Sequence, residues 1–179
     1  LVDVTNYVSL ELGQPTHAFD ADKVSNIRVA PMGAPGVFTT LDGTERKMQA
    51  DDMMICDGSK PVAIAGIMGG LETEITGSST RVMLESANFR APRIRRTAGR
   101  LNLRTDASQR YEKTQPPANV KVGTERILKL VEESGVAYRV ETRFSLAGDL
   151  QDETRWIELP PGRLNKLVGV DFPQEKALE

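Results

Sequence analysis

Short apolar segments separated by turn-forming residues constrain the fold of this 179-residue chain more than any other feature. Asp42-Gly43 is typical of a hairpin turn, and Asp57-Gly58-Ser59 separates two further apolar runs. The strand-like runs span residues 27–31, 37–41, 44–48, 53–57, 61–65 and 82–86. They predict an α+β fold of mainly antiparallel sheets with several helices packed around them, and not a doubly wound parallel sheet.

Helix-forming patterns flank these strands. An apolar stripe over residues 4–12 predicts the first helix, which stops at Gly13. Segment 14–20, which contains a proline and the only histidine, is expected to be a loop or tight turn, and residues 136–142 alternate like a further strand. Three more helices are expected, at residues 92–100, 106–112 and 117–134.

The composition changes near residue 148, so the chain is expected to divide there. Residues 1–147 would form one module, and residues 148–179 a linker and the truncated start of a next domain. In that tail, residues 155–159 predict a strand and residues 161–169 a short helix, a strand–helix piece too small to bury a core alone. The chain begins without an initiator methionine and stops in mid-pattern, so both ends are expected to be cut from a longer polypeptide.

Composition disfavours several classes of protein. Hydrophobic residues make up 39% of the chain and the net charge is −2, which is typical of a soluble globular protein and not of general nucleic-acid binding. No apolar run approaches the roughly 20 residues of a membrane helix. One cysteine, Cys56, and one histidine allow neither an internal disulfide nor a usual zinc cluster, and indicate a reducing compartment. A Gly-x-x-x-x-Gly-Lys loop is also missing, which disfavours an unrelated nucleotide-binding protein.

Three stretches carry the candidate binding residues. Gly-Ile-Met-Gly-Gly (66–70) follows an apolar strand, where glycine permits positive φ or the close approach of a ligand to the main chain. Glu85 stands where another apolar strand runs out, and Thr-Asp-Ala-Ser (105–108) is typical of a helix N-cap with exposed amides. These stretches offer exposed main-chain groups, one carboxylate and the amides of a helix N-terminus. Together they predict a pocket for a small polar ligand.

Arginine is concentrated beside these stretches. Seven arginines and one acidic residue lie between positions 90 and 110. They can form a solvated helix face that pairs with acids elsewhere, or a phosphate-contacting rim beside the pocket.

Seven blocks occur in the order typical of the β subunit of bacterial phenylalanyl-tRNA synthetase, and the chain resembles that family. The resemblance covers roughly residues 1–146, the family's editing module, and the tail from Trp156 resembles the opening of the next domain. After Arg-Tyr-Glu the chain has Lys-Thr-Gln-Pro-Pro (113–117) where the family normally has Arg-Gly-Val-Asp-Pro, which affects only the turn into the following helix. The blocks are Val-Asp-Val-Thr-Asn-Tyr-Val (2–8), Glu-Leu-Gly-Gln-Pro-Thr-His-Ala-Phe-Asp (11–20), Leu-Asp-Gly-Thr-Glu (41–45), Ala-Gly-Ile-Met-Gly-Gly (65–70), Leu-Glu-Ser-Ala-Asn-Phe (84–89), Leu-Arg-Thr-Asp-Ala-Ser (103–108) and Arg-Tyr-Glu (110–112).

The resemblance implies a function, since that module hydrolyses tyrosine wrongly esterified to the phenylalanine tRNA. It implies as partners the tRNA(Phe) acceptor end carrying tyrosine and the synthetase α subunit, with no membrane and a cytoplasmic location. No metal and no cofactor are expected in this chain, because the ATP and magnesium of aminoacylation are bound elsewhere in the synthetase. The implied site residues are His17 and Thr105 for catalysis, Glu85, Gly69, Gly70 and Ala107 for substrate binding, and Arg93, Arg96, Arg100 and Arg104 as candidates for tRNA contact.

Chemistry gives Glu85 a selective role. Tyrosine is phenylalanine plus one hydroxyl, and an apolar pocket rejects an added hydroxyl by only about 10²-fold. An ionised Glu85 would accept a hydrogen bond from the phenol, whereas phenylalanine would leave the carboxylate desolvated and unpaired, at roughly 1–3 kcal/mol or more. The alternative places Glu85 in a salt bridge with Arg81 or an arginine of residues 90–110, with Gly69 an ordinary turn glycine and Thr105 and Ala107 ordinary capping residues.

Hydrolysis needs a positioned water and a stabilised oxyanion. His17 would orient the water or the terminal ribose, or act as a general base, and orientation is favoured because no carboxylate at recognisable spacing fixes its tautomer. A lone histidine is also compatible with a purely structural hydrogen bond. Amides near Thr105 or Gly69 would stabilise the oxyanion, and no triad order or metal-ligand cluster is visible. The alternative function is a non-catalytic module that positions tRNA or packs between subunits, with a vestigial pocket.

Overall fold

The computed structural model describes residues 1–141, 144–148, 156–160, 162–171 and 173–177. Every strand pairing among them is antiparallel, within the sheets β1-β8, β2-β5-β6-β7 and β3-β4, which confirms the predicted α+β class. The elements in chain order are α1 (Val2–Leu12), β1 (Thr16–Asp20), β2 (Ile27–Pro31), β3 (Gly36–Thr39), β4 (Glu45–Met48), β5 (Met53–Asp57), β6 (Lys60–Ile64), β7 (Met68–Gly69), η1 (Leu71–Thr73), β8 (Val82–Ser86), α2 (Ala91–Arg100), α3 (Asp106–Tyr111), α4 (Asn119–Glu133), α5 (Arg163–Val168) and α6 (Gln174–Ala177).

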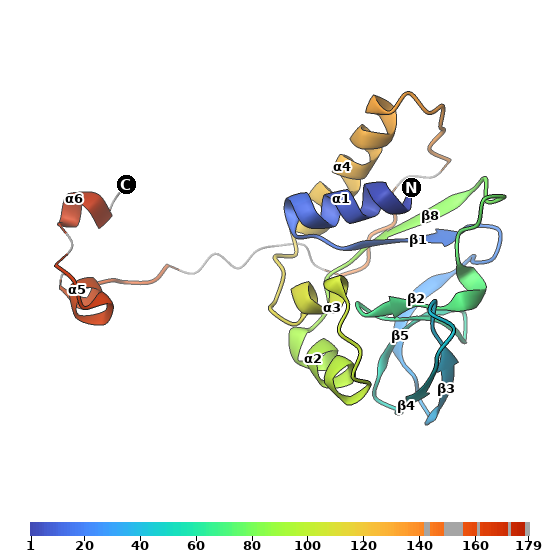
Figure 1. The fold of residues 1–179 in the computed structure, drawn as a ribbon, viewed down its shortest axis with the longest axis horizontal. Helices are drawn as coiled ribbons and strands as arrows, with labels where there is room; N and C mark the ends of the chain where they lie inside the picture. The colour runs from blue at the N-terminus through green and yellow to red at the C-terminus, as the bar shows by residue number, and fades with distance from the viewer. Residues whose placement is uncertain (142–143, 149–155, 161, 172, 178–179) are drawn as a thin grey trace.

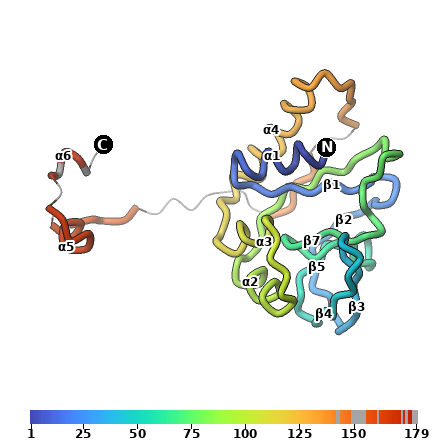
Figure 2. The backbone as a smooth tube through the Cα atoms, viewed as in Figure 1, coloured from blue at the N-terminus to red at the C-terminus, as the bar shows by residue number. Residues whose placement is uncertain are grey.

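The helices and sheets stack in layers around the four-stranded sheet. Helices α1 and α4 pack on each other and on the β1–β8 ribbon (Figure 1). The ribbon and the four-stranded sheet share a core in which Phe19 of β1 meets Ile55 and Ala63. On the other face of that sheet, Met54 and Ile64 pack against Ile94 of α2. Helix α2 lies at the opposite end of this assembly from α1 and α4 (Figure 2).

The expectation of a loop or turn over residues 14–20 is wrong. Residues 16–20 form β1, which pairs with β8 so that Thr16 lies opposite Ser86 and His17 opposite Glu85. Side chains alternate along a strand, and His17 accordingly shares a face with Phe19, whose ring centroid lies 4.5 Å away in an edge-on arrangement. The proline and polar residues of this segment do not predict a strand. The strand forms because of its partner, which lies far along the chain.

Two expected strands do not form within the described residues. Residues 136–141 are irregular and their alternating apolar side chains stay exposed, because no neighbouring strand takes up their main-chain groups; residue 142 lies outside the described part. Residues 156–159 are also irregular, and Trp156 is 96% exposed. The expected short helix is confirmed as α5. The boundary predicted near residue 148 remains a prediction, since residues 149–155 lie outside the described part.

No helix within the described ranges is long and apolar enough to cross a membrane.

Candidate functional site

Strands β1 and β8 bring His17 and Glu85 together. The two residues are register partners, so their side chains leave the ribbon on the same face, toward the four-stranded sheet. They line a pocket of about 70 Å³ that also includes Gly69 of β7 and Ala107 of α3. Four residues predicted from separate parts of the sequence thus meet in one cavity.

The Glu85 carboxyl is partly buried and unpaired. Burial raises its pKa from 4.5 to about 7, because the ionised form loses hydration without gaining a partner. Within the described residues no hydrogen bond or ion pair reaches it. The alternative of a salt bridge with Arg81 is wrong, since Arg81 bonds Asp22 at 2.8 Å and Glu141 at 3.0 Å. The carboxyl therefore has its hydrogen-bonding capacity free for a ligand.

The His17 imidazole is neutral at neutral pH. Burial lowers its pKa from 6.5 to about 4, since the pocket disfavours the imidazolium. A base this weak takes up a proton poorly near pH 7. The lowered pKa thus fits the orienting role expected for His17 better than proton transfer, and the role itself stays a prediction.

Gly69 and Gly70 face different cavities. A Cβ on Gly69 would lie 2.7 Å from His17 Cε1, so only glycine lets the imidazole lie against this main chain. A Cβ on Gly70 would instead lie 2.6 Å from both Phe38 Cζ and the Val62 carbonyl oxygen. The structure therefore places Gly69 at the His17 pocket and Gly70 on the wall of a second hollow.

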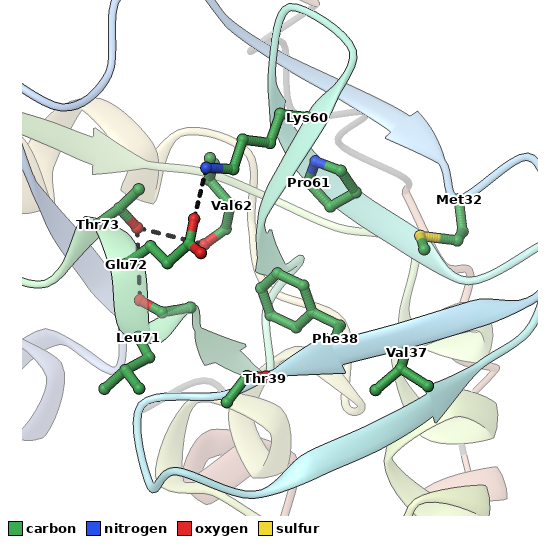
Figure 3. Close-up of a pocket in the computed structure, with 11 residues that line it drawn as sticks. Met32, Val37, Phe38, Thr39, Lys60, Pro61, Val62, Leu71, Glu72 and Thr73 are labelled. Atoms are coloured by element: carbon green, nitrogen blue, oxygen red, sulfur yellow. Dashed lines mark hydrogen bonds and ion pairs between the residues drawn. The ribbon is translucent and has the colours of Figure 1, made fainter.

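This second hollow is larger, about 270 Å³, and opens between β3, β6 and η1 (Figure 3). Apolar side chains such as Phe38 and Leu71 line it. Its charged groups are Lys60 and Glu72, which form an ion pair and are 67% and 73% exposed. We take the smaller pocket as the candidate site, because buried ionisable groups with displaced pKa values mark functional sites better than volume does.

Helix α3 presents Ala107 to the pocket and uses Thr105 as its N-cap. The Thr105 hydroxyl accepts a hydrogen bond from the Ser108 amide at 3.1 Å and donates one to the Ile67 carbonyl at 2.8 Å. The Ser108 hydroxyl in turn accepts a hydrogen bond from the Thr105 amide, which completes a capping box. The structure thus shows the capping role of Thr105, and its part in catalysis stays a prediction.

Comparison with known proteins identifies the family. The profile described as B3/4 domain matches residues 1–135. The chain belongs to the B3/4 domain family. Three relatives named phenylalanine–tRNA ligase beta subunit come from Moorella thermoacetica (39% identical, 96% of this chain, 22% of the relative), Gloeobacter violaceus (42%, 97% and 22%) and Oleidesulfovibrio alaskensis (54%, 63% and 14%).

These matches confirm the resemblance seen in the seven sequence blocks. The chain spans about a fifth of the length of the first two of these curated relatives.

The arginines of α2 and of the segment between α2 and α3 are engaged with protein acceptors. Arg93 reaches the main-chain oxygen of Asp51 at 3.3 Å, and Arg96 its carboxylate at the same distance. Arg104 pairs with Glu112 at 3.1 Å. Arg96 and Arg104 are nevertheless 69% and 66% exposed, so their charge is still open to solvent.

Arg100, the fourth candidate for tRNA contact, is largely structural. Its guanidinium pairs with the buried Asp52 carboxylate and donates to the Lys47 carbonyl at 2.8 Å. Asp52 also accepts a hydrogen bond from Thr97 of the same helix at 2.8 Å. Arg100 thus holds α2 to the β4–β5 connection. The role of these four arginines in tRNA binding stays a prediction.

Sequence reasoning assigned no role to Gln14 and Tyr111, which the structure places directly behind the pocket. Gln14 is fully buried, and Tyr111 is buried with its ring in the pocket wall. The Gln14 amide donates toward the Tyr111 hydroxyl at 3.3 Å, across 97 residues of sequence, while its Oε1 has no partner in the described part. Nothing local signals such a contact.

Within the ranges that the structure describes, no group of three or more His, Cys, Asp or Glu side chains is placed to hold a metal ion.

Proposed function

We propose that this B3/4 domain hydrolyses tyrosine wrongly esterified to the phenylalanine tRNA, as the editing part of a phenylalanine–tRNA ligase. The observation that carries the proposal is the unpaired Glu85 carboxyl, which shares a small pocket with His17 and Gly69. A partly buried carboxyl without a protein partner is free to bind a ligand that completes its hydrogen bonds. The relatives' names supply the tRNA and the amino acid.

The phenol hydroxyl of tyrosine can donate the hydrogen bond that the Glu85 carboxyl lacks. A pKa of about 7 leaves the empty site close to half ionised at neutral pH. A phenol hydroxyl that donates to the carboxylate favours the ionised form, so bound tyrosine would lower this pKa. Phenylalanine would exclude water without donating a hydrogen bond, at roughly 1–3 kcal/mol. Glu85 would thereby select tyrosine.

The pocket must widen to admit an aromatic ring. Its volume of about 70 Å³ is roughly half that of a cavity of about 150 Å³ that holds benzene. Met68 is in the pocket lining, and an unbranched methionine side chain rearranges readily. We expect Met68 to move when the substrate ring enters.

Hydrolysis would proceed by positioning a water molecule. The neutral His17 imidazole would orient this water toward the ester carbonyl, and an aminoacyl ester is reactive enough for positioning to supply much of the rate. Main-chain amides at the start of α3, which Thr105 caps, or beside Gly69 would stabilise the oxyanion. The reaction would need no cofactor in this chain, with ATP and magnesium used elsewhere in the ligase.

The proposal includes partners and a location. They are the acceptor end of tRNA(Phe), with Arg93, Arg96 and Arg104 as candidate phosphate contacts, an α subunit and the cytoplasm. The small pocket volume favours one alternative, a non-catalytic module that positions tRNA and keeps a vestigial pocket.

The deciding experiment compares hydrolysis of tyrosyl-tRNA(Phe) and phenylalanyl-tRNA(Phe) by the complete ligase. Glu85→Ala should lower the preference for the tyrosyl ester by about 10- to 100-fold, the value of a hydrogen bond to a charged group. Glu72→Ala is the matched control, since this glutamate lies in the larger hollow and pairs with Lys60. A ligase that hydrolyses neither ester, or an unchanged preference in Glu85→Ala, would support the non-catalytic alternative.

A further inference from the structure

The pairing of β1 with β8 stops at a proline. The last register pair is Thr16 with Ser86, and one further step sets Pro15 opposite Ala87. Proline has no N–H, so Pro15 cannot donate to the Ala87 carbonyl and the antiparallel ladder cannot continue. The Ala87 carbonyl therefore needs a hydrogen-bond donor from elsewhere, and within the described residues no main-chain hydrogen bond reaches the Pro15 carbonyl either.

Two buried side chains supply those donors. The Gln14 amide nitrogen lies 3.0 Å from the Pro15 oxygen and 2.9 Å from the Ala87 oxygen. The Tyr111 hydroxyl lies 2.9 Å and 3.0 Å from the same two oxygens. The amide has two hydrogens and the hydroxyl has one, so together they can give each carbonyl at least one hydrogen bond, in a buried setting where hydrogen bonds are strong and a missing one is costly. We call Gln14 and Tyr111, together with these two carbonyls, the strand-end clamp.

The strand-end clamp also holds helix α3. Tyr111 is the last residue of that helix, which carries Ala107 into the pocket. The Tyr111 ring packs edge-on against Phe89 at 5.1 Å between centroids. Gly66 leaves room for both rings, since a Cβ there would lie 2.8 Å from Phe89 and 3.0 Å from Tyr111. The hydroxyl is therefore fixed by packing as well as by its hydrogen bonds.

The three clamped elements are those that carry the site. Strand β1 holds His17, β8 holds Glu85 and α3 holds Ala107. A ribbon of two strands is a weak support alone, and it twists more than a wider sheet. We propose that Gln14 and Tyr111 are positioning residues for the hydrolytic site, whose clamp sets the spacing of His17, Glu85 and α3. The inference rests on the proposed editing function.

The test uses the complete ligase with Tyr111→Phe, which keeps the ring and removes the hydroxyl, and Gln14→Met, which keeps the length and removes the amide. Because a displacement of about 1 Å can cost about 10²-fold in rate, kcat for tyrosyl-tRNA hydrolysis should fall by about 10- to 100-fold. KM should change by less than about twofold. Tyr138→Phe is the matched control, since it removes a hydroxyl from a side chain that is 46% exposed, and it should change neither constant.

A second measurement reports on the clamp without the reaction. Hydrogen exchange of the β1 and β8 amides should be faster in Tyr111→Phe than in the wild type and unchanged in Tyr138→Phe. The double variant should lose about as much kcat as the more damaging single variant, because both side chains serve the same two carbonyls.

The outcomes separate this inference from the proposed function. Folded variants with a lower melting temperature but unchanged kcat would show a merely structural role and overturn the inference. If the wild-type ligase itself hydrolyses no tyrosyl-tRNA, the proposed function fails, and the inferred positioning role falls with it. Unchanged amide exchange in Tyr111→Phe would overturn the clamp even if the ligase edits. Should Gln14→Met fail to fold, Tyr111→Phe alone decides.

Discussion

The two hollows of this domain are separated by two adjacent glycines, and they differ in how their ionisable groups are satisfied. The smaller one holds His17 and Glu85, whose pKa values are displaced by burial alone. The larger one carries Lys60 and Glu72, where the hydrogen bond from Lys60 lowers the pKa of Glu72. Satisfied charges in solvent need no ligand, whereas unpaired buried ones do. The comparison teaches that unpaired burial, and not volume, identifies the candidate site.

The largest expected effect is on hydrolysis. His17→Ala should lower kcat for tyrosyl-tRNA hydrolysis in the complete ligase by about 100-fold, because the attacking water loses its orienting partner. Binding of free tyrosine to the same variant should weaken much less. Rates and affinities measured side by side check this, and an undiminished rate would remove His17 from the mechanism.

The two buried groups should affect stability in opposite directions as pH changes. Unfolded Glu85 loses its proton near pH 4.5 and folded Glu85 near 7, so rising pH destabilises the fold between these values. Unfolded His17 binds a proton below about 6.5 and folded His17 only below about 4, so rising pH stabilises the fold over that range. The two contributions nearly cancel in the wild type.

Variants that remove one of the two groups should reveal the pH dependence of stability that the other group causes. With Glu85→Gln, stability should rise from pH 4 to 6.5, by about 1–3 kcal/mol. With His17→Asn, it should fall by a similar amount from pH 4.5 to 7. Denaturant unfolding across this range measures both slopes, and parallel curves for all three proteins would show that the two groups are not buried as described.

The glycine pair should separate stability from activity. Gly70→Ala should cost about 1–3 kcal/mol of unfolding free energy, because its new Cβ meets the Val62 main chain, which cannot move aside. Gly69→Ala should cost less, since the His17 side chain can turn away, but hydrolysis should suffer. Unfolding curves of the two variants test the difference, and equal losses would contradict the assignment of each glycine to its own hollow.

The smallest effect is expected in the larger hollow. Lys60→Ala and Glu72→Ala break an exposed ion pair, and such pairs contribute little to stability. Melting temperature and hydrolysis rate should both stay at the wild-type values. A loss of hydrolysis in either variant would reverse the comparison and move the chemistry to the larger hollow.

Local patterns sufficed for much of the fold. The residues of β8 and β5 match the predicted 82–86 and 53–57, because apolar runs between turn residues define a strand without reference to its partner. The cap at Thr105 was likewise legible from its own residues. Cys56 lies within the predicted strand 53–57 and is buried in β5.

The features that local sequence patterns did not predict depend on pairing between residues far apart in the sequence. Strand β1 was expected to be a loop because its proline and polar residues give no signal, yet β8 supplies its partner. The alternating residues 136–141 gave a strand signal and found no partner within the described part. For the site, the family blocks named His17, Glu85 and Ala107, but Tyr111 bonds Pro15 across 96 residues, a contact that no local pattern encodes.

The register of the β1–β8 ribbon makes these two strands intolerant of inserted or deleted residues. Because neighbouring side chains on a strand point in opposite directions, a one-residue slip of β8 would turn Glu85 toward α4 and bring a neighbour into its place. A carboxylate would then be buried against a helix, and the cavity would lose its proton acceptor. Single-residue insertions or deletions inside either strand should therefore abolish both folding stability and selectivity.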